Sequence, residues 1–596
     1  MTQHPSASPA TGQNLIIGAI LAGGGVFGLL WAAGVTSALV TGHPVPHGHP
    51  AGAFTVFAHP GNPSAAWHAP VGPPVLYWTV LAAFLATMGA GSFFAWRAWR
   101  VLAAREKNDP TRMPGLASRR EVVVAAGEKA LLRKAATLRP SLTHPPASEV
   151  GYALGSSRGV TCWASVEDSM VLLGPPRSGK GLHVVIPMIL DAPGAVITTS
   201  TRPDNLAVTL AARASADRPV AVFDPQRLAP GVASTTRWSP IRGCEDPQVA
   251  MTRARALTAD PADGVENSTF WAQQCYTAVR CLLHAAALAG RQPVELFHWS
   301  LSPVAAGDAV TILKSPNAAP AWSAALDAIL SADPRTRDST WAMVSNTFAP
   351  LADPAVLDAV SPREHGHFDP ATFLRENGTL YLLGTATGAS ATAGLVAAFI
   401  EDVAEAARRI AAASPGARLD PPLALVLDEG ANYPIPSLPA LMSEGGGTGI
   451  TTTVVLQSLA QARSKWGQQD AEAIWDSAIV KVVLGGSGNA DDLRDLSALI
   501  GTREEKQLNT SWAYDGKRSY SMSTQDKPIL EPGQLRTLRF GNAVLLLRSA
   551  PPIMMTLRKW TERKDGAALA AARANAEAAI RQSAAASARH AQRRGA

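Results

Sequence analysis

A glycine-rich loop directly after a predicted strand constrains the fold of this chain more than any other segment. The apolar run Ser169 to Leu173 is typical of a strand, and Leu182 to Leu190 has a helical pattern. A G-x-x-x-x-G-K loop between strand and helix wraps backbone N–H groups around phosphate, and the helix start adds partial positive charge. The sequence therefore predicts a nucleotide-binding loop made of Gly174, Pro175, Pro176, Arg177, Ser178, Gly179, Lys180 and Gly181.

The end of this loop defines the expected chemistry. Lys180 is placed to reach the β- and γ-phosphates. Gly181 stands where most such loops carry the serine or threonine that binds Mg²⁺. We therefore expect Mg²⁺ to be held by water, by phosphate and by a distant carboxylate.

The distant carboxylate is predicted at the end of a second apolar strand. Leu423 to Leu427 is followed by Asp428 and Glu429. In this position Asp428 can hold hydrated Mg²⁺ while Glu429 polarises the attacking water. The alternative is that the two acids only cap a helix or lie on a solvated edge. Gln457, which ends the next strand, is placed to sense the γ-phosphate, although this residue alone would carry no weight.

Short β-branched runs alternate with helical patterns after residue 160, as in a doubly wound, mostly parallel α/β sheet. We expect strands at Ser169–Leu173, Ala195–Thr199, Val220–Phe223, Thr379–Leu383, Leu423–Leu427, Thr452–Leu456, Ile479–Leu484 and Ala543–Leu547. They divide a nucleotide-binding domain into a first part, 161–247, and a second part, 363–565. Residues 248–362 between them, rich in Ala and Leu, predict an inserted all-α subdomain. The Ala-rich tail, 566–596, is expected to be a solvated helix or frayed, without assigned chemistry.

The first 96 residues contain no Lys, Arg, Asp or Glu. Residues 15–40 and 75–96 are apolar and long enough to cross a hydrocarbon core about 30 Å thick, which predicts two transmembrane helices. A cleaved signal peptide is the alternative, but no basic residue precedes the first helix. With two transmembrane helices, residues 1–14 would be a cytoplasmic tail and residues 41–74 an extracytoplasmic loop.

The basic excess of the chain lies next to the second apolar segment. Residues 97–149 hold eleven basic and five acidic residues, which accounts for the whole net charge of +6. We interpret 97–160 as a basic connector that stays in the cytoplasm, contacts membrane lipid and keeps both termini and the nucleotide-binding domain on that side. The net charge is therefore no evidence for nucleic-acid binding.

Several motifs together resemble those of the TraG-like coupling ATPases of type IV secretion systems, a group related to the FtsK and HerA motors. The resemblance extends from about Ser169 to Arg563. It depends on GPPRSGKG, with glycine after the lysine, on LVLDE and LQS, and on four further segments: Ser200–Asp204, Phe223–Pro225, Trp238–Ile241 and Gly485–Arg494. Arg202 replaces the lysine that is usual in the first of these.

The resemblance implies a RecA-like fold, ATP and Mg²⁺ as ligands, and a homohexamer with nucleotide at the subunit interfaces. It also implies an inner-membrane protein that works with single-stranded DNA or a relaxase–DNA complex and with secretion-channel proteins. In relatives an arginine precedes the glutamine strand, whereas this chain has Gly445–Gly449 there. Arg177, Arg202 and Arg463 remain alternatives for this role.

Contact with a polymer is predicted for residues 503–527, where basic and aromatic residues alternate. A mobile surface insertion is an equally good interpretation. Three functions stay open: a conjugative coupling motor, a double-stranded DNA translocase in partition, and a nucleotide-switched receptor for secreted proteins with little hydrolysis.

Overall fold

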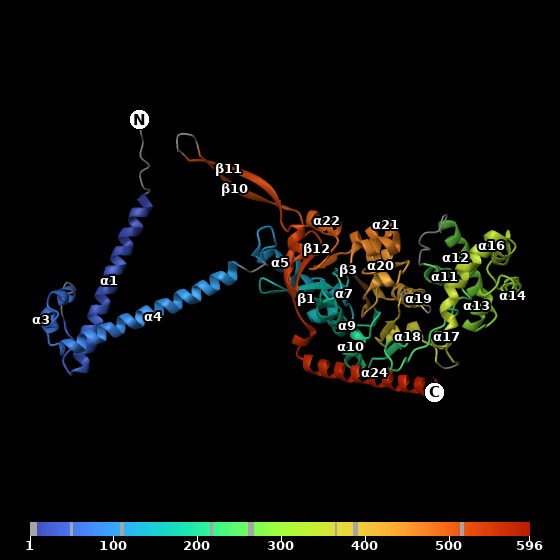
Figure 1. Ribbon diagram of the computed structural model, residues 1–596, viewed down its shortest axis with the longest axis horizontal. Coiled ribbons are helices and arrows are strands. Elements are labelled where there is room, and N and C mark those ends of the chain that lie inside the picture. Colours follow the sequence, from blue (N-terminus) through green and yellow to red (C-terminus); the bar gives the residue numbers. More distant parts are fainter. Residues whose placement is uncertain are drawn as a thin grey trace. The chain divides into compact units, whose positions relative to one another are not determined.

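The computed structural model describes residues 9–47, 52–107, 112–214, 218–259, 268–363, 366–385, 391–512 and 518–595 (Figure 1). The chain divides into two compact units, Met1–Asp109 and Pro110–Ala596. Each unit is described separately.

The first unit is built from two long helices, α1 (Pro9–Val40) and α4 (Pro74–Lys107). Between them lie the short helices α2 (Gly52–Thr55), η1 (Val56–Ala58) and α3 (Pro63–Trp67). The Tyr77 hydroxyl on α4 donates a hydrogen bond of 3.2 Å to the Leu30 carbonyl on α1, within a small apolar cluster around Trp67.

Within the described residues, one helix is long and apolar enough to cross a membrane. This is the 24-residue segment Pro74–Arg97 of α4, with a mean hydropathy of 1.5. The apolar segment found in α1, Gly25–Val40, is shorter. The two-span arrangement expected from the sequence is therefore not confirmed and stays a prediction.

The second unit is organised around an eleven-stranded sheet in the order β2-β1-β13-β12-β9-β3-β8-β7-β4-β6-β5. All eight predicted strands are present, with ends within two residues of those expected. The strands are β1 (Gly151–Ser157), β2 (Val160–Ser165), β3 (Met170–Leu173), β4 (Val196–Ser200), β5 (Val220–Phe223), β6 (Thr379–Leu383), β7 (Leu423–Leu427), β8 (Ile450–Leu456), β9 (Val480–Leu484), β12 (Asn542–Leu547) and β13 (Ile553–Leu557).

The strands from β9 to β5 in this order are all parallel to their neighbours, as predicted. Their two faces pack into two different cores. Met170 and Leu172 of β3 join one apolar cluster with Met188 of α9 (Ile186–Asp191), whereas Val171 and Leu173 join the other. Because successive side chains of a strand point to opposite faces, this alternation identifies a sheet covered on both sides.

The other edge of the sheet differs from the prediction. β12 runs antiparallel to β9, and β13, β1 and β2 continue the antiparallel order. β1 and β2 are joined by Arg158 and Gly159, whose φ values of +50° and +74° suit the two-residue turn of a hairpin. Gly155 in β1 lowers the strand propensity, yet a Cβ there would lie 2.5 Å from the Thr556 carbonyl oxygen of β13.

The described part of the segment expected to be a connector, 97–160, contains the end of α4, four short helices, all of β1 and the first residue of β2. The short helices are α5 (Arg119–Ala126), α6 (Glu128–Leu132), α7 (Ala135–Leu138) and α8 (Ala147–Val150). Val122, Leu131 and Leu138 are buried in the cluster that covers one face of the sheet. This part of the chain therefore contributes to the core.

The described residues between β5 and β6 form helices with one isolated β-bridge, which agrees with the predicted all-α insertion. These are α11 (Pro247–Leu257), α12 (Ser268–Leu288), α13 (Pro293–Ser300), α14 (Gly307–Ile312), α15 (Trp322–Leu330), α16 (Pro334–Phe348), η4 (Ala349–Ala352), α17 (Pro354–Val360) and α18 (Pro370–Arg375). The helices associated with the sheet are η3 (Gly181–Val185), α10 (Asp204–Ala214), α19 (Ala393–Ala412), η5 (Pro415–Ala417), η6 (Gly430–Asn432), α20 (Leu438–Glu444), α21 (Leu459–Ser477), α22 (Ala490–Ile500) and α23 (Pro532–Arg536).

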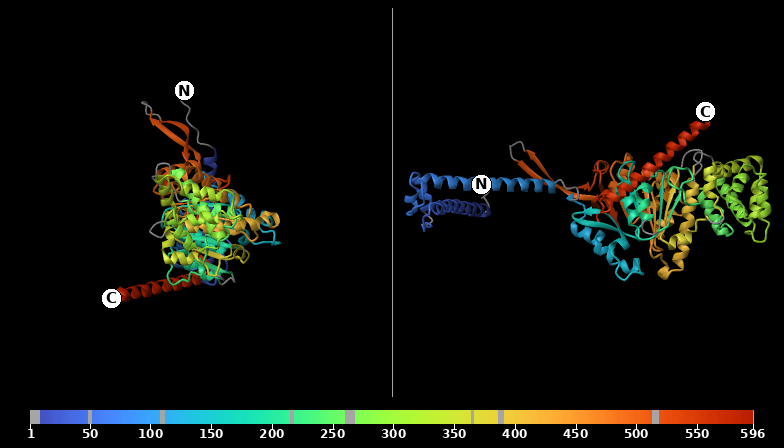
Figure 2. Two further views of the ribbon diagram at one scale, coloured as in Figure 1. Left: turned by 90° about the vertical axis from the view of Figure 1, so that its right-hand side faces the viewer. Right: turned by 90° about the horizontal axis from the view of Figure 1, so that it is seen from below.

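Two further elements lie outside the sheet. β10 (Thr502–Trp512) and β11 (Arg518–Pro528) pair only with each other. Tyr514 and Lys517, part of the predicted polymer-binding segment, lie outside the described residues, so this contact stays a prediction. After η7 (Trp560–Glu562) the tail forms α24 (Gly566–Gly595), which lies beside α10 (Figures 1 and 2). The described part of the tail is thus a helix, the first of the two predicted alternatives. Most of its side chains are exposed or partly exposed, while Leu569 is buried against the rest of the unit.

Candidate functional site

The predicted phosphate loop follows β3 and is anchored to the neighbouring strand. The Gly174 N–H donates to the Leu456 carbonyl of β8 at 3.1 Å. Within the loop, the Ser178 hydroxyl donates to the Pro175 carbonyl at 2.8 Å. These contacts hold the loop in one shape. Five of the eight predicted loop residues line a cavity, namely Pro176, Arg177, Gly179, Lys180 and Gly181.

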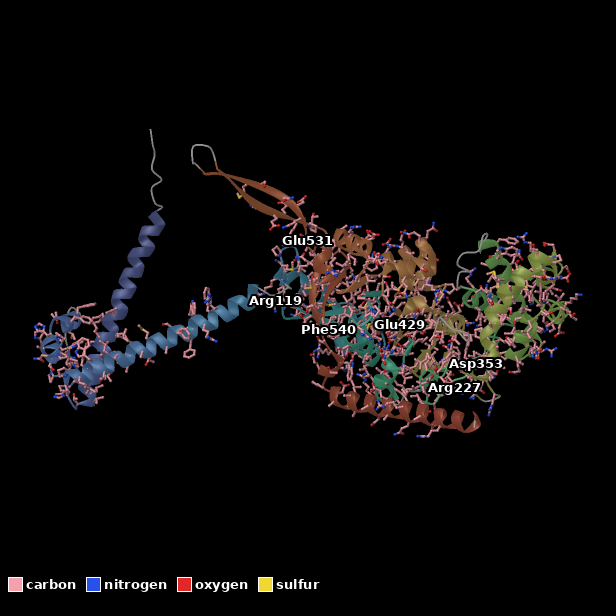
Figure 3. The ribbon with its side chains drawn as sticks, viewed as in Figure 1. Arg119, Arg227, Asp353, Glu429, Glu531 and Phe540 are labelled. Atoms are coloured by element: carbon pink, nitrogen blue, oxygen red, sulfur yellow. The ribbon has the colours of Figure 1, made fainter. Side chains whose placement is uncertain are left out.

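Gly179 shows why the loop needs glycine. Its φ is +93°, and a Cβ there would lie 2.8 Å from the His183 ring and 2.9 Å from the Phe540 ring. Both a left-handed backbone and a close approach are therefore required at this position. Phe540 and Glu429 are labelled in Figure 3, within the part of the second unit that carries the sheet.

Lys180 is folded back onto its own loop. Its Nζ donates to the Gly174 carbonyl at 2.6 Å and to the Pro175 carbonyl at 3.1 Å. Burial lowers the pKa of Lys180, although the nearby Asp428 and Glu429 carboxylates oppose this shift. Phosphate oxygens of a bound nucleotide would offer this ammonium group stronger acceptors than two neutral carbonyls.

The acid pair lies at the carboxyl end of β7, in the same cavity as the phosphate loop. The Asp428 carbonyl accepts a hydrogen bond from the Thr199 hydroxyl at 2.8 Å, and its Oδ2 accepts from the Asn205 amide at 2.9 Å. Glu429 has a left-handed backbone with φ +51°. It occupies the N-cap position of η6 but makes no capping hydrogen bond with its side chain. The helix-cap interpretation of Glu429 is therefore not supported.

One oxygen of Glu429 is held and the other is available. Oε2 accepts hydrogen bonds from the Thr201 hydroxyl and, at 3.3 Å, from the Asn432 amide. Oε1 has no hydrogen-bond partner among the described residues. A non-glycine residue in a left-handed conformation that is fixed by two neighbours is typical of functional sites.

The surroundings of Asp428 shift its pKa in opposite directions. Burial raises the pKa of Asp428, and the Asn205 amide, followed by Lys180, acts against this shift by stabilising the carboxylate. Asn205 thereby becomes a positioning residue for the predicted Mg²⁺ ligand. It directly follows the Ser200–Asp204 segment, but its own role could not be predicted from sequence.

Replacing Asn205 with leucine tests this role. Loss of the amide donor raises the pKa of Asp428 further, so the carboxylate is protonated over a wider acidic range. We expect roughly tenfold lower Mg²⁺ affinity at neutral pH, with the acidic limb of Mg²⁺-dependent nucleotide binding displaced to higher pH. A Mg²⁺ titration of nucleotide binding at several pH values measures both effects, and Asn317→Leu, at an exposed position, is the control. An unchanged acidic limb would contradict the assignment.

The amide oxygen of Asn205 lies close to Gly181. A Cβ at Gly181 would lie 3.4 Å from the Asn205 Oδ1 atom, so an amide oxygen approaches the place where other loops carry a hydroxyl. Among the described residues, no group of three or more His, Cys, Asp or Glu side chains could hold a metal. One carboxylate with phosphate oxygens and water is nevertheless the coordination that Mg²⁺ commonly has in nucleotide sites. Asp428 would be the protein ligand.

Gln457 lines the same cavity, after the end of β8. Two contacts fix the chain just beyond it. The Ser458 hydroxyl oxygen accepts from the Gln461 N–H at 3.1 Å, and the Asp492 carboxylate accepts from the Leu459 N–H at 3.0 Å. Asp492 belongs to one of the segments that carry the family resemblance.

The complete cavity has a volume of about 510 Å³. Besides residues of the loop, the acid pair and Gln457, it contains Ser200 from β4, Arg202 from the segment after it, and Asp204 and Asn205 from the start of α10. It also contains Trp560 and Arg573, which come from the segment after the sheet. These two were missed because Trp560, in η7, belongs to none of the recognised motifs, and Arg573 lies in an Ala-rich helix that carries no motif signalling a site.

The three candidates for a catalytic arginine lie in two different places. Arg177 and Arg202 line the cavity of their own chain, whereas Arg463 pairs with Asp492 at 3.4 Å and with Asp495 at 3.7 Å. The glycine loop 445–449 precedes β8, so it lies at the opposite edge of the sheet from the phosphate loop. The loop therefore does not reach the cavity of its own chain, and none of its residues lines that cavity.

Two protein-family models match the chain. Residues 128–278 match "Type IV secretory system Conjugative DNA transfer", and residues 422–540 match "TraM recognition site of TraD and TraG". The conjugal transfer protein TraG of Rhizobium radiobacter is 28% identical over 120 residues, which are 20% of this chain and 19% of that protein. TraG of Agrobacterium fabrum is 27% identical over 120 residues, 20% of this chain and 18% of that protein. The chain thus matches about a fifth of the length of these relatives.

Solved structures of the conjugative coupling protein TrwB share the fold. The unbound form has a TM-score of 0.53 and 17% identity, covering 73% of this chain and 92% of that one. The form with a non-hydrolysable ATP analogue has a TM-score of 0.52 and 18% identity, covering 73% and 93%.

The fold is RecA-like, as in the TrwB structures, and the cavity joins the predicted phosphate loop to the acid pair. Among RecA-like proteins the chain is similar to the TraG-like conjugative coupling proteins, and the resemblance expected from its motifs is confirmed.

Proposed function

We propose that this protein is an inner-membrane coupling ATPase that recruits DNA or a nucleoprotein and drives it into a type IV secretion channel. The observation that carries the proposal is the meeting of Lys180, Asp428, Glu429 and Gln457 in one cavity at the carboxyl ends of parallel strands. Ligands of open α/β sheets bind at this edge.

Each residue has a defined task in the proposed reaction. The loop N–H groups and Lys180 hold the β- and γ-phosphates of ATP. Asp428 holds Mg²⁺, which neutralises phosphate charge when bound. Gln457 orients the attacking water, and Oε1 of Glu429 accepts its proton while Oε2 stays anchored by Thr201 and Asn432.

The assembly and its surroundings are part of the same proposal. Two membrane helices, 15–40 and 75–96, anchor the chain with both termini and the ATPase domain in the cytoplasm. Six copies form a ring with nucleotide at the interfaces. The all-α subdomain, 248–362, receives the relaxase–DNA complex, and the basic connector contacts anionic lipid. The assembled ring works with the channel proteins of the secretion system.

Phosphate release by the full-length protein in detergent tests the function. We expect single-stranded DNA to raise the rate, duplex DNA to raise it less, and Lys180→Ala to remove the signal in both cases. A rise with duplex DNA alone would identify a partition translocase. Nucleotide binding without turnover in assembled rings would identify a nucleotide-switched receptor, an alternative favoured by the absence of a basic residue in 445–449.

A further inference from the structure

Helix α24 brings a basic side chain into the nucleotide cavity from outside the segments that match known families. Arg573 and Trp560 line the cavity together with Lys180 and Asp428. The two family matches end at residue 278 and residue 540. Neither match therefore assigns a role to this helix.

α24 is held on the body by apolar contacts on one face. Leu569 is 3% exposed and packs in a cluster with Trp560, Ile186 and Val208. Further along α24, Ile580 packs against a cluster around Leu206 of α10. At Gly231, a Cβ would lie 2.6 Å from the Ala579 carbonyl oxygen, which shows how closely the helix approaches the body.

Arg573 lies on this packed face. Leu569, Arg573 and Ile580 are four and seven residues apart, so they fall within about 40° of one another around an ideal helix. The spacing points Arg573 inward between two apolar anchors, although its side chain remains 48% exposed. Trp560 packs with Leu569, at the start of α24, and with Ile186, on the helix after the phosphate loop.

The guanidinium of Arg573 is only partly used. Its Nε donates to Glu577 Oε1 at 2.7 Å, and its two terminal nitrogens have no hydrogen-bond partner within the described part of the chain. Glu577 also pairs with Arg581, at 4.0 Å. Four donor hydrogens on a planar group facing a phosphate site suit paired contacts to phosphate oxygens.

We infer that Arg573 is a phosphate-binding residue of the nucleotide site, supplied by α24 of the same chain, and that Glu577 competes with the nucleotide for it. The inference builds on the proposed nucleotide binding. The ligand is the triphosphate chain of a nucleoside triphosphate. Removing Arg573 lowers affinity, whereas neutralising Glu577 frees Arg573 and raises affinity.

Equilibrium binding of a fluorescent ATP analogue to the full-length protein in detergent tests this. Arg573→Ala is expected to weaken binding about tenfold, since hydrogen bonds to charged groups are lost. Glu577→Gln is expected to tighten binding several-fold. Arg581→Ala is the control: it removes the other basic partner of Glu577 on the same helix, at a residue that does not line the cavity. The affinity of this variant is expected to stay close to that of the parent.

The outcomes separate this inference from the proposed function. Lys180→Ala must abolish binding if the cavity is the nucleotide site at all. If Lys180→Ala abolishes binding while Arg573→Ala and Arg581→Ala have the same affinity, the proposed role of Arg573 is wrong, but the cavity remains the nucleotide site. If Glu577→Gln weakens binding, the competition is wrong. Equal melting temperatures of the parent and the three α24 variants show that the helix remains packed, and a fall confined to Arg573→Ala would make its effect structural.

Discussion

Glu429→Gln is expected to bind ATP within a few-fold of the parent and to lose turnover by a factor of about 10²–10⁴, the usual contribution of a general base. The physical reason lies in the two oxygens of Glu429. Oε2 is held by Thr201 and Asn432, and a glutamine side chain of the same shape can keep both contacts. The amide cannot accept the proton of the attacking water.

Separate measurements of binding and of single-turnover phosphate release check this expectation. Glu444→Gln is the matched control, because Glu444 is an exposed acid at the end of α20, before the glycine loop at the opposite edge of the sheet. Turnover equal to the parent in Glu429→Gln would remove this residue from the reaction. A loss of binding instead would make it a structural residue.

Lys180→Ala is expected to weaken nucleotide binding by at least ~100-fold, since two charge-assisted contacts to phosphate are removed together. The fold should be retained. Among the described residues, the Lys180 ammonium group donates to the Gly174 and Pro175 carbonyls of its own loop, and the loop has other anchors, including the Gly174 contact to β8.

Titration with ATP, together with a melting curve, measures both parts of this prediction. Lys314→Ala removes an exposed lysine of the helical insertion and should bind ATP like the parent. Retained ATP affinity in Lys180→Ala would mean that the loop around Lys180 is not the nucleotide site.

The parallel part of the sheet was predictable because its strands are buried on both faces. Such strands appear in the sequence as short continuous apolar runs, as in Leu423–Leu427, and their carboxyl ends then place Lys180, Asp428 and Gln457 at one edge. Geometry of the sheet thus converts three separate motifs into one site.

The antiparallel edge and the residues around the acids were not predictable in the same way. β1 contains Gly151 and Gly155, which lower strand propensity. The close approach that each glycine allows, Gly151 to Ala164 of β2 and Gly155 to Thr556 of β13, becomes visible only in the folded sheet. Nothing in a sequence states which way β12 runs. The roles proposed for Asn205 and Arg573 depend on their lining a cavity built from distant segments, so no local pattern marks them.

The close fit of α24 on α10 has a practical consequence for handling the protein. A chain shortened at Arg563 would leave Trp560, Ile186 and Val208 without their cover from Leu569, which would expose an apolar patch beside the candidate nucleotide cavity. For the same reason, affinity tags are better placed at the amino terminus. A bulky group attached after α24 would disturb the packing of a helix that lines the candidate nucleotide cavity.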